Sequence, residues 1–151
     1  MKSTKRCLPV LAIGLAFFFT GTLAAQMTAQ FDSRMAIPTL PCVNNRPLVV
    51  TGPTTVNIQD NPVGDATHVA VHLQINANGQ DDAGNPYQVS VEGNAQFDAA
   101  ALSYDVPFHS QWIGQGQAAN FPLTGVITVY IHDDGTVTTL ATSVALPACT
   151  N

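Results

Sequence analysis

Residues 68–76 read HVAVHLQIN, and this stretch decides the fold class of the chain. Val69, Val71, Leu73 and Ile75 alternate with small or polar residues, so every second side chain is apolar. Successive side chains of a β-strand point to opposite faces, and a period of two is typical of a strand with one buried face. The stretch therefore predicts a strand that has one apolar and one polar face.

The same period recurs on both sides of this strand. Gly52-Pro53 separates two short runs that precede it, and turn-forming residues fill 60–65. Pro107 predicts that its strand lies at a sheet edge or ends there, because proline cannot donate to a ladder. Asp133-Asp134-Gly135 predicts a hairpin between 123–131 and 136–146. The alternating runs are 48–51, 54–59, 68–76, 87–92, 102–109, 123–131 and 136–146.

These runs predict an all-β domain of about seven to eight strands. Each strand has one apolar face, so the faces must meet either between two stacked sheets or inside a closed sheet. Uneven strand lengths and frequent proline favour an antiparallel β-sandwich. A closed β-barrel is the alternative.

The first 25 residues have the organisation of a secretory signal peptide. Lys2, Lys5 and Arg6 precede an apolar run at 8–19, and small residues follow it. The run is shorter than the ~20 apolar residues that a bilayer core requires. We therefore expect cleavage near residue 25, no stable membrane anchor after cleavage, and a secreted protein that is periplasmic or extracellular.

Cleavage makes the remaining chain strongly acidic. It keeps only Arg34 and Arg46 as cations, against ten Asp and Glu, a formal charge of −8. A chain this poor in cations cannot neutralise phosphates, so the composition argues against nucleic acid as a partner.

Two cysteines, Cys42 and Cys149, remain after cleavage and lie near the ends of the domain. In an oxidising compartment such a pair tends to form a disulfide. We expect a single all-β domain at 42–151 that a Cys42–Cys149 bond closes. A metal pair or a reactive thiol is the alternative, although no CxxC spacing supports it.

Residues 26–41 form an extended leader before this domain. Met27, Ala29, Phe31, Met35 and Ile37 share odd positions, which is strand-like. Three placements are open: a mobile leader, docking on the chain's own domain, or pairing with the sheet edge of a neighbouring subunit. Self-association through residues 26–41 or through a sheet edge is therefore an expected kind of partner contact.

Several turn and core motifs resemble those of a loose group of uncharacterised secreted bacterial β domains. These motifs lie between residue 68 and Cys149. The resemblance implies an all-β fold and no activity, cofactor or catalytic residue. The motifs are Gly84-Asn85-Pro86-Tyr87, Gln115-Gly116 with Asn120-Phe121, Asp134-Gly135-Thr136-Val137 and the closing Cys149.

Two sets of residues are candidates for a metal site. The loop at 76–85 reads NANGQDDAGN, and Asn78, Asp81 and Asp82 are its candidate calcium ligands, although the same residues form ordinary turns. His68 and His72 face one side of a strand but lie ~13 Å apart there, too far to share one ion. Either would need His109, His132 or an Asp from another strand.

Trp112, Tyr130 and His132 are the candidate residues for binding a ligand or partner. If the odd face of 123–131 is the core, Tyr130 is exposed beside Thr128 and His132. An aromatic ring there serves either recognition or cross-strand packing, and both roles stay open for Trp112 and Tyr130.

No grouping of residues predicts a catalytic mechanism or a cofactor. The chain lacks the G-x-S-x-G nucleophile motif, and Gly114-Gln115-Gly116 lacks the Lys of a phosphate loop. We expect a secreted, non-enzymatic structural or interaction module. The alternatives are a small-ligand-binding β-barrel and, less favoured, a hydrolase-type enzyme that uses His and Asp groups.

Overall fold

A computed structural model describes residues 25–40, 46–63, 66–116 and 118–145. The predicted signal peptide (all but its last residue), Cys42 and Cys149 lie outside these residues. The described chain is all-β, as the two-residue period predicted, and contains no helix, including none long and apolar enough to cross a membrane. The strands are β1 (Gln26–Leu40), β2 (Arg46–Val63), β3 (Ala66–Asp81), β4 (Pro86–Phe97), β5 (Ser103–Gly114), β6 (Phe121–Ile131) and β7 (Val137–Ala145).

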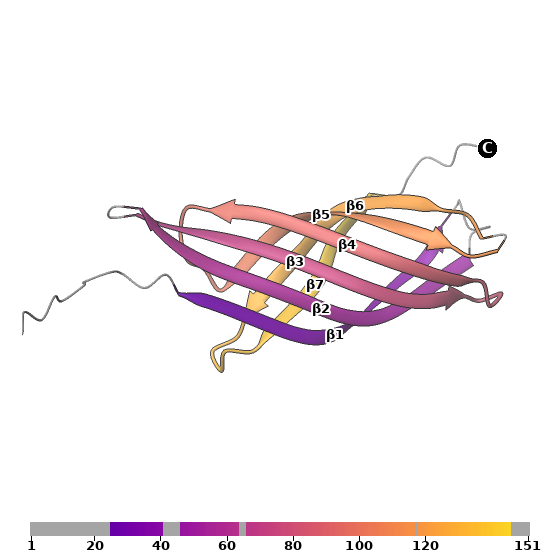
Figure 1. Ribbon diagram of the computed structural model, residues 1–151, viewed down its shortest axis with the longest axis horizontal. Helices are drawn as coiled ribbons and strands as arrows, with labels where there is room; N and C mark the ends of the chain where they lie inside the picture. Colours follow the sequence, from indigo (N-terminus) through magenta and orange to yellow (C-terminus); the bar gives the residue numbers. More distant parts are fainter. Residues whose placement is uncertain (1–24, 41–45, 64–65, 117, 146–151) are drawn as a thin grey trace, which may run out of the picture.

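The seven strands form one antiparallel sheet in the order of the sequence, β1 to β7. Figure 1 shows that this sheet curls, so that β7 passes behind β2 and β3. Two stacked sheets, the arrangement that we favoured from the sequence, are not seen among the described residues, because a curled sheet already brings apolar faces together. The sheet is an open half-barrel: within the described chain, β1 and β7 are its two edges and are not paired with each other.

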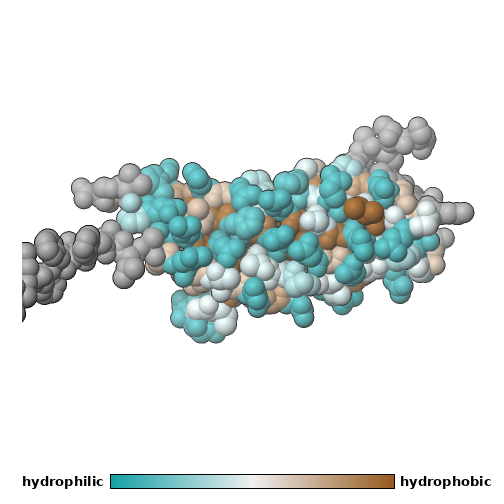
Figure 2. Space-filling view, in the orientation of Figure 1, coloured by the Kyte–Doolittle hydropathy of each residue, from teal (hydrophilic) through white to brown (hydrophobic). Residues whose placement is uncertain are grey.

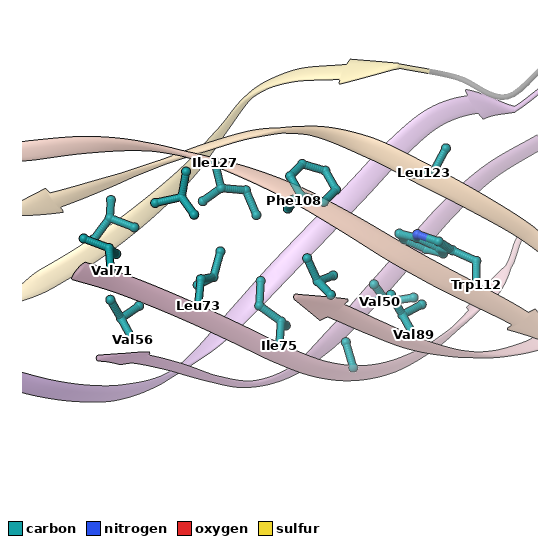
Figure 3. Close-up of a cluster of buried hydrophobic side chains, with 14 of the residues drawn as sticks. Val50, Val56, Val71, Leu73, Ile75, Val89, Phe108, Trp112, Leu123 and Ile127 are labelled. Carbon is teal, nitrogen blue, oxygen red and sulfur yellow. The ribbon is translucent and has the colours of Figure 1, made fainter. Parts of the chain in front are cut away.

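The interior of the curl holds the core. Leu73 and Ile75 on β3 point toward Phe108 and Ile127 from β5 and β6 (Figure 3). The buried residues alternate with exposed ones along β4 and β5, as a strand with one covered face requires. The face seen in Figure 2 is mainly hydrophilic, with apolar patches between the polar side chains. The sheet therefore has an apolar inside and a polar outside.

Phe108 lies between two glycines on neighbouring strands, and these glycines leave the space that its ring occupies. It pairs with Gly93 on β4 and with Gly125 on β6. A Cβ at Gly125 would lie 2.8 Å from Phe108 Cε1 and 2.1 Å from the Ser143 carbonyl oxygen, so only glycine fits there. Glycine in a strand commonly marks a close approach or a bend, and a neighbouring aromatic ring covers it.

Two prolines lie inside strands where the sequence predicted breaks. β2 runs through Gly52-Pro53, but its ladder with β3 skips both residues. β5 runs through Pro107, and its pairing with β4 begins at the next residue, Phe108, which lies opposite Gly93. Each proline therefore sits where one neighbouring ladder is interrupted, which is the position that a missing N–H tolerates.

Two segments differ from the sequence prediction in their extent. β3 continues to Asp81, so the predicted loop at 76–85 is reduced to a short turn that ends before Pro86. Residues 26–40, for which three placements were open, form β1 and pair with β2 from Gln26↔Gln59 to Leu40↔Arg46. The sheet therefore begins at Gln26.

Candidate functional site

A cleft of about 490 Å³ opens into the interior of the half-barrel between β1 and β7. Its sides are β1 from Phe31 to Ile37 and β7 from Thr138 to Val144. Its floor consists of inward side chains from the central strands, chiefly Ile75, Val91, Phe108, Trp112, Leu123 and Ile127. The cleft exists because the sheet curls without joining its first strand to its last.

The floor of the cleft is mainly apolar, and its two polar groups, the Ser110 hydroxyl and the Trp112 indole N–H, form hydrogen bonds within the protein. The Ser110 hydroxyl donates to the Leu123 carbonyl oxygen at 3.1 Å and accepts from Trp112 Nε1 at 2.9 Å. Buried polar groups with such partners do not require a polar ligand. The floor therefore suits an apolar occupant.

Trp112 forms an aromatic wall with Phe121. Their ring centroids lie 5.6 Å apart and the rings are nearly parallel, at 15°. Trp112 is only 2% exposed, yet it contributes to the lining of the cleft. A rigid, hydrogen-bonded indole at this place gives the cleft a fixed apolar surface.

The two sides of the cleft differ from its floor in exposure. Val144 is 42% exposed and lies opposite Gly125 on β6, on the inward side of the sheet. Phe31 and Met35 on β1 are half-buried and lie opposite Thr54 and Val50, which are buried. Apolar side chains that remain partly exposed on the inside of a sheet mark a surface that a further group can cover.

The three residues that the sequence singled out for binding lie on opposite faces. Trp112 points into the interior, whereas Tyr130 lies on the outer face, 37% exposed, opposite Ser103 and Thr138. His132 is exposed just after β6, where its Nε2 lies 2.8 Å from Thr138 Oγ1. The structure therefore places Trp112 in the cleft and keeps Tyr130 and His132 outside it.

Of the candidate metal ligands, Asp81 ends β3 and Asp82 follows it in the β3–β4 turn, whereas Asn78 lies within β3. The Asp81 carboxylate accepts hydrogen bonds from the backbone N–H groups of Ala83 and Asn85, at 2.9 and 2.8 Å. The Asn85 side-chain amide donates to its other oxygen at 2.7 Å. This is the pattern of an Asx turn, in which the carboxylate holds the loop. Asn78 is exposed on β3, between Thr51 and Gln88.

The described histidines are dispersed, each with its own neighbour. His68 Nδ1 lies 3.3 Å from Asp98, and His109 Nε2 lies 3.9 Å from Glu92. His72 Nδ1 lies 2.6 Å from the Asn94 side-chain oxygen. Within the described ranges, no group of three or more His, Cys, Asp and Glu is placed to hold a metal ion.

The turn next to His132 carries a perturbed carboxylate. The Thr136 hydroxyl and backbone N–H both donate to Asp134, at 2.7 and 2.9 Å. These hydrogen bonds, with a smaller contribution from nearby His132, lower the pKa of Asp134. Gly135 has φ of 80°, so the Asp-Gly hairpin that the sequence predicted is confirmed. The carboxylate holds the turn.

Sequence reasoning missed the residues on the sides of the cleft. Phe31, Met35 and Val144 were not named as site residues, although the odd-position alternation of 26–37 was noted. That alternation is the signal that places Phe31 and Met35 on the inner face. No sequence signal shows that β1 and β7 face each other across an opening.

None of the family models, curated proteins or solved structures compared with this chain matches it.

Proposed function

We propose that this protein is an exported, non-enzymatic binding module whose half-barrel holds an apolar small molecule, such as one with a hydrocarbon chain. The observation that carries the proposal is the cleft of about 490 Å³ with an apolar floor. Small-molecule sites commonly enclose ~300–1,000 Å³ and are lined mainly by apolar and aromatic side chains. The volume is also many times the ~30 Å³ share of one water molecule.

The distribution of charge favours an uncharged occupant. Asp32 and Arg34 are the charged residues that border the cleft, and both are exposed at its edge rather than on its floor. Burying an unpaired charge against the floor would be costly, whereas an apolar chain loses nothing when it leaves water. The ligand class that fits best is therefore neutral and apolar over the part that enters.

The test uses Trp112, which is the only tryptophan of the chain. A neutral probe, N-phenyl-1-naphthylamine, is titrated into the purified mature protein while the emission of Trp112 and of the probe is recorded. Binding in the cleft predicts saturable probe emission and matched quenching of Trp112, because the acceptor then lies close to the indole. Absence of saturable binding would overturn the proposal.

A matched pair of variants locates the binding. Val144→Arg places a charge on one side of the cleft, where Val144 is already 42% exposed, so folding is retained. Ile113→Arg makes the same kind of change on β5, where Ile113 is 50% exposed and does not line the cleft. We expect probe affinity to fall about tenfold or more for Val144→Arg and to stay unchanged for Ile113→Arg.

A further inference from the structure

The free edge of β1 carries an unusual arrangement of charge. Arg34 is one of only two cations that remain after residue 25, and Asp32 lies two positions before it on the same outer face. Both side chains are exposed, and neither has an ion-pair partner within the described part of the chain. Ser33, between them, is the middle residue of the fifteen in β1.

This arrangement is complementary to itself when a second β1 runs antiparallel to the first. If Ser33 lies opposite Ser33 of a second copy, Asp32 of each copy faces Arg34 of the other. On the inner face the same register brings Phe31 opposite Met35 of the second copy. Opposite charges and aromatic side chains that lie directly across a strand pair are the contacts that stabilise sheets. A parallel, in-register pair would instead place Asp32 against Asp32 and Arg34 against Arg34.

We propose that two copies of this protein pair antiparallel through the free edges of β1, centred on Ser33, so that two Asp32–Arg34 ion pairs fix the register of one continuous sheet. Residues 29–37 of the two copies, which belong to the part of β1 that pairs regularly with β2, then lie opposite one another. Such a contact is isologous, since the same surface of each copy meets the other. It also satisfies edge N–H and C=O groups of β1 that have no strand partner on that side among the described residues.

The charges account for the choice of this edge. Edge strands usually carry charge that prevents further pairing. A single acid or a single base in the middle of β1 would do this, because it would meet its own copy in antiparallel register. An acid and a base placed symmetrically about the centre have the opposite effect, since each meets its complement. Asp32 and Arg34 on β1 therefore favour pairing with a second copy of this chain over pairing with other extended chains.

The test is a charge swap on the purified mature protein, read by sedimentation equilibrium at low salt. Asp32→Arg and Arg34→Asp each place like charges across the pairing, so we expect dimer affinity to fall about ten- to thirtyfold. The double variant that carries both changes restores opposite charges in every pair and should dimerise like the unmodified protein. An equimolar mixture of the two single variants should form a heterodimer, because one is basic and the other acidic along the same edge.

Several outcomes would overturn this pairing. They are a monomer for the unmodified protein at all concentrations, single variants that dimerise unchanged, or a double variant that stays monomeric. Circular dichroism of each variant separates these outcomes from misfolding, and the exposed positions of Asp32 and Arg34 predict unchanged spectra. The readout does not depend on ligand, so loss of dimerisation and loss of probe binding are distinguishable.

Discussion

The two edge strands of the half-barrel border the same cleft but are built differently. β1 alternates regularly, buries or half-buries its odd side chains from Met27 to Ile37, and carries Asp32 and Arg34 outside. β7 has no charged residue and no proline, and Val137 is its one buried side chain. Both edge ladders contain an irregularity, between Ile37 and Leu40 for β1 and between Val126 and Ile127 for the β6–β7 pair, so the two strands differ in burial and charge. The difference indicates that β1 packs against the core along most of its length, whereas β7 packs against it mainly through Val137. The charges of β1 fit the single pairing register proposed above.

The largest effect is expected from removing the predicted Cys42–Cys149 disulfide. β1 and β7 run in the same direction, because an odd number of antiparallel strands separates first from last, so both strands end at the same end of the sheet. A bond that closes a loop of about 100 residues would stabilise the fold by at most about 4–5 kcal/mol in the chain-entropy model. We expect Cys42→Ser to lower the free energy of unfolding by up to that amount in urea.

Cys149→Ser is the matched control for that experiment. If the two cysteines are bonded to each other, both single variants and the double variant lose the same stability, because each breaks one shared bond. Additive losses of stability in the double variant would mean that the two cysteines act separately. No disulfide would then link the segments that follow β1 and β7.

The second prediction tests the unequal attachment of the two edges directly. Ile37 on β1 is 9% exposed, whereas Val144 on β7 is 42% exposed. Truncating a buried isoleucine to alanine commonly lowers the free energy of unfolding by about 2–5 kcal/mol. For Ile37→Ala we expect the lower part of this range, because Ile37 lies on an edge strand. Val144→Ala should stay within about 0.5 kcal/mol, as for a surface position. Equal losses in urea denaturation would contradict the comparison.

The sequence predicted the strands better than it predicted their assembly. The alternation at Val69, Val71, Leu73 and Ile75 is local, and each of these side chains is buried as expected. Whether the strands stack as two sheets or curl as one depends on pairings between distant residues, for which a two-residue period carries no signal. The short run at 136–146 gave no indication that β7 would form an edge of the sheet in the described part of the chain.

The candidate site was predictable only in part, for the same reason. Trp112 was named because it is aromatic, and it lies in the cleft wall. Tyr130 and His132 were named for their exposure beside polar groups, and they are indeed outside, but an outer face does not form the cleft. The cleft depends on β1 and β7 not pairing with each other in the described part of the chain, and the absence of a pairing leaves no pattern in the sequence of either strand.

A third, smaller effect on stability is expected for a substitution on the central strand β4, which serves as a comparison for the substitutions on β1 and β7. The Tyr87 hydroxyl on β4 is buried without a hydrogen-bond partner among the described residues. Tyr87→Phe removes an unsatisfied polar group and keeps the ring contact with Phe121, at 6.0 Å between centroids. We expect the free energy of unfolding to rise by about 1 kcal/mol, with no change in dimer affinity. A loss of stability would show that the hydroxyl has a partner.

The same residue predicts a pH dependence. Burial, and then the charge of Asp81, raise the pKa of Tyr87 above its ordinary value of 10.0. Above pH 10 the unfolded chain has lost this proton while the folded chain keeps it, so stability should fall as pH rises there. Tyr87→Phe should remove this component of the decline. An identical alkaline decline in both proteins, measured by urea denaturation, would contradict the assignment.

The smallest effect is expected where β7 is changed, and it decides which edge assembles. Leu140 is 57% exposed near the middle of β7, opposite Thr128, and a charge there would oppose any pairing of β7 with a second copy. If copies meet through β1, Leu140→Lys should leave dimer affinity within about twofold, whereas Asp32→Arg weakens it at least about tenfold. If instead the uncharged edge is the one that pairs, Leu140→Lys abolishes the dimer and Asp32→Arg has no effect. The dimer affinities of Leu140→Lys and Asp32→Arg therefore change in opposite ways for the two models. This measurement shows whether the copies pair through the charged edge of β1 or through the uncharged edge of β7.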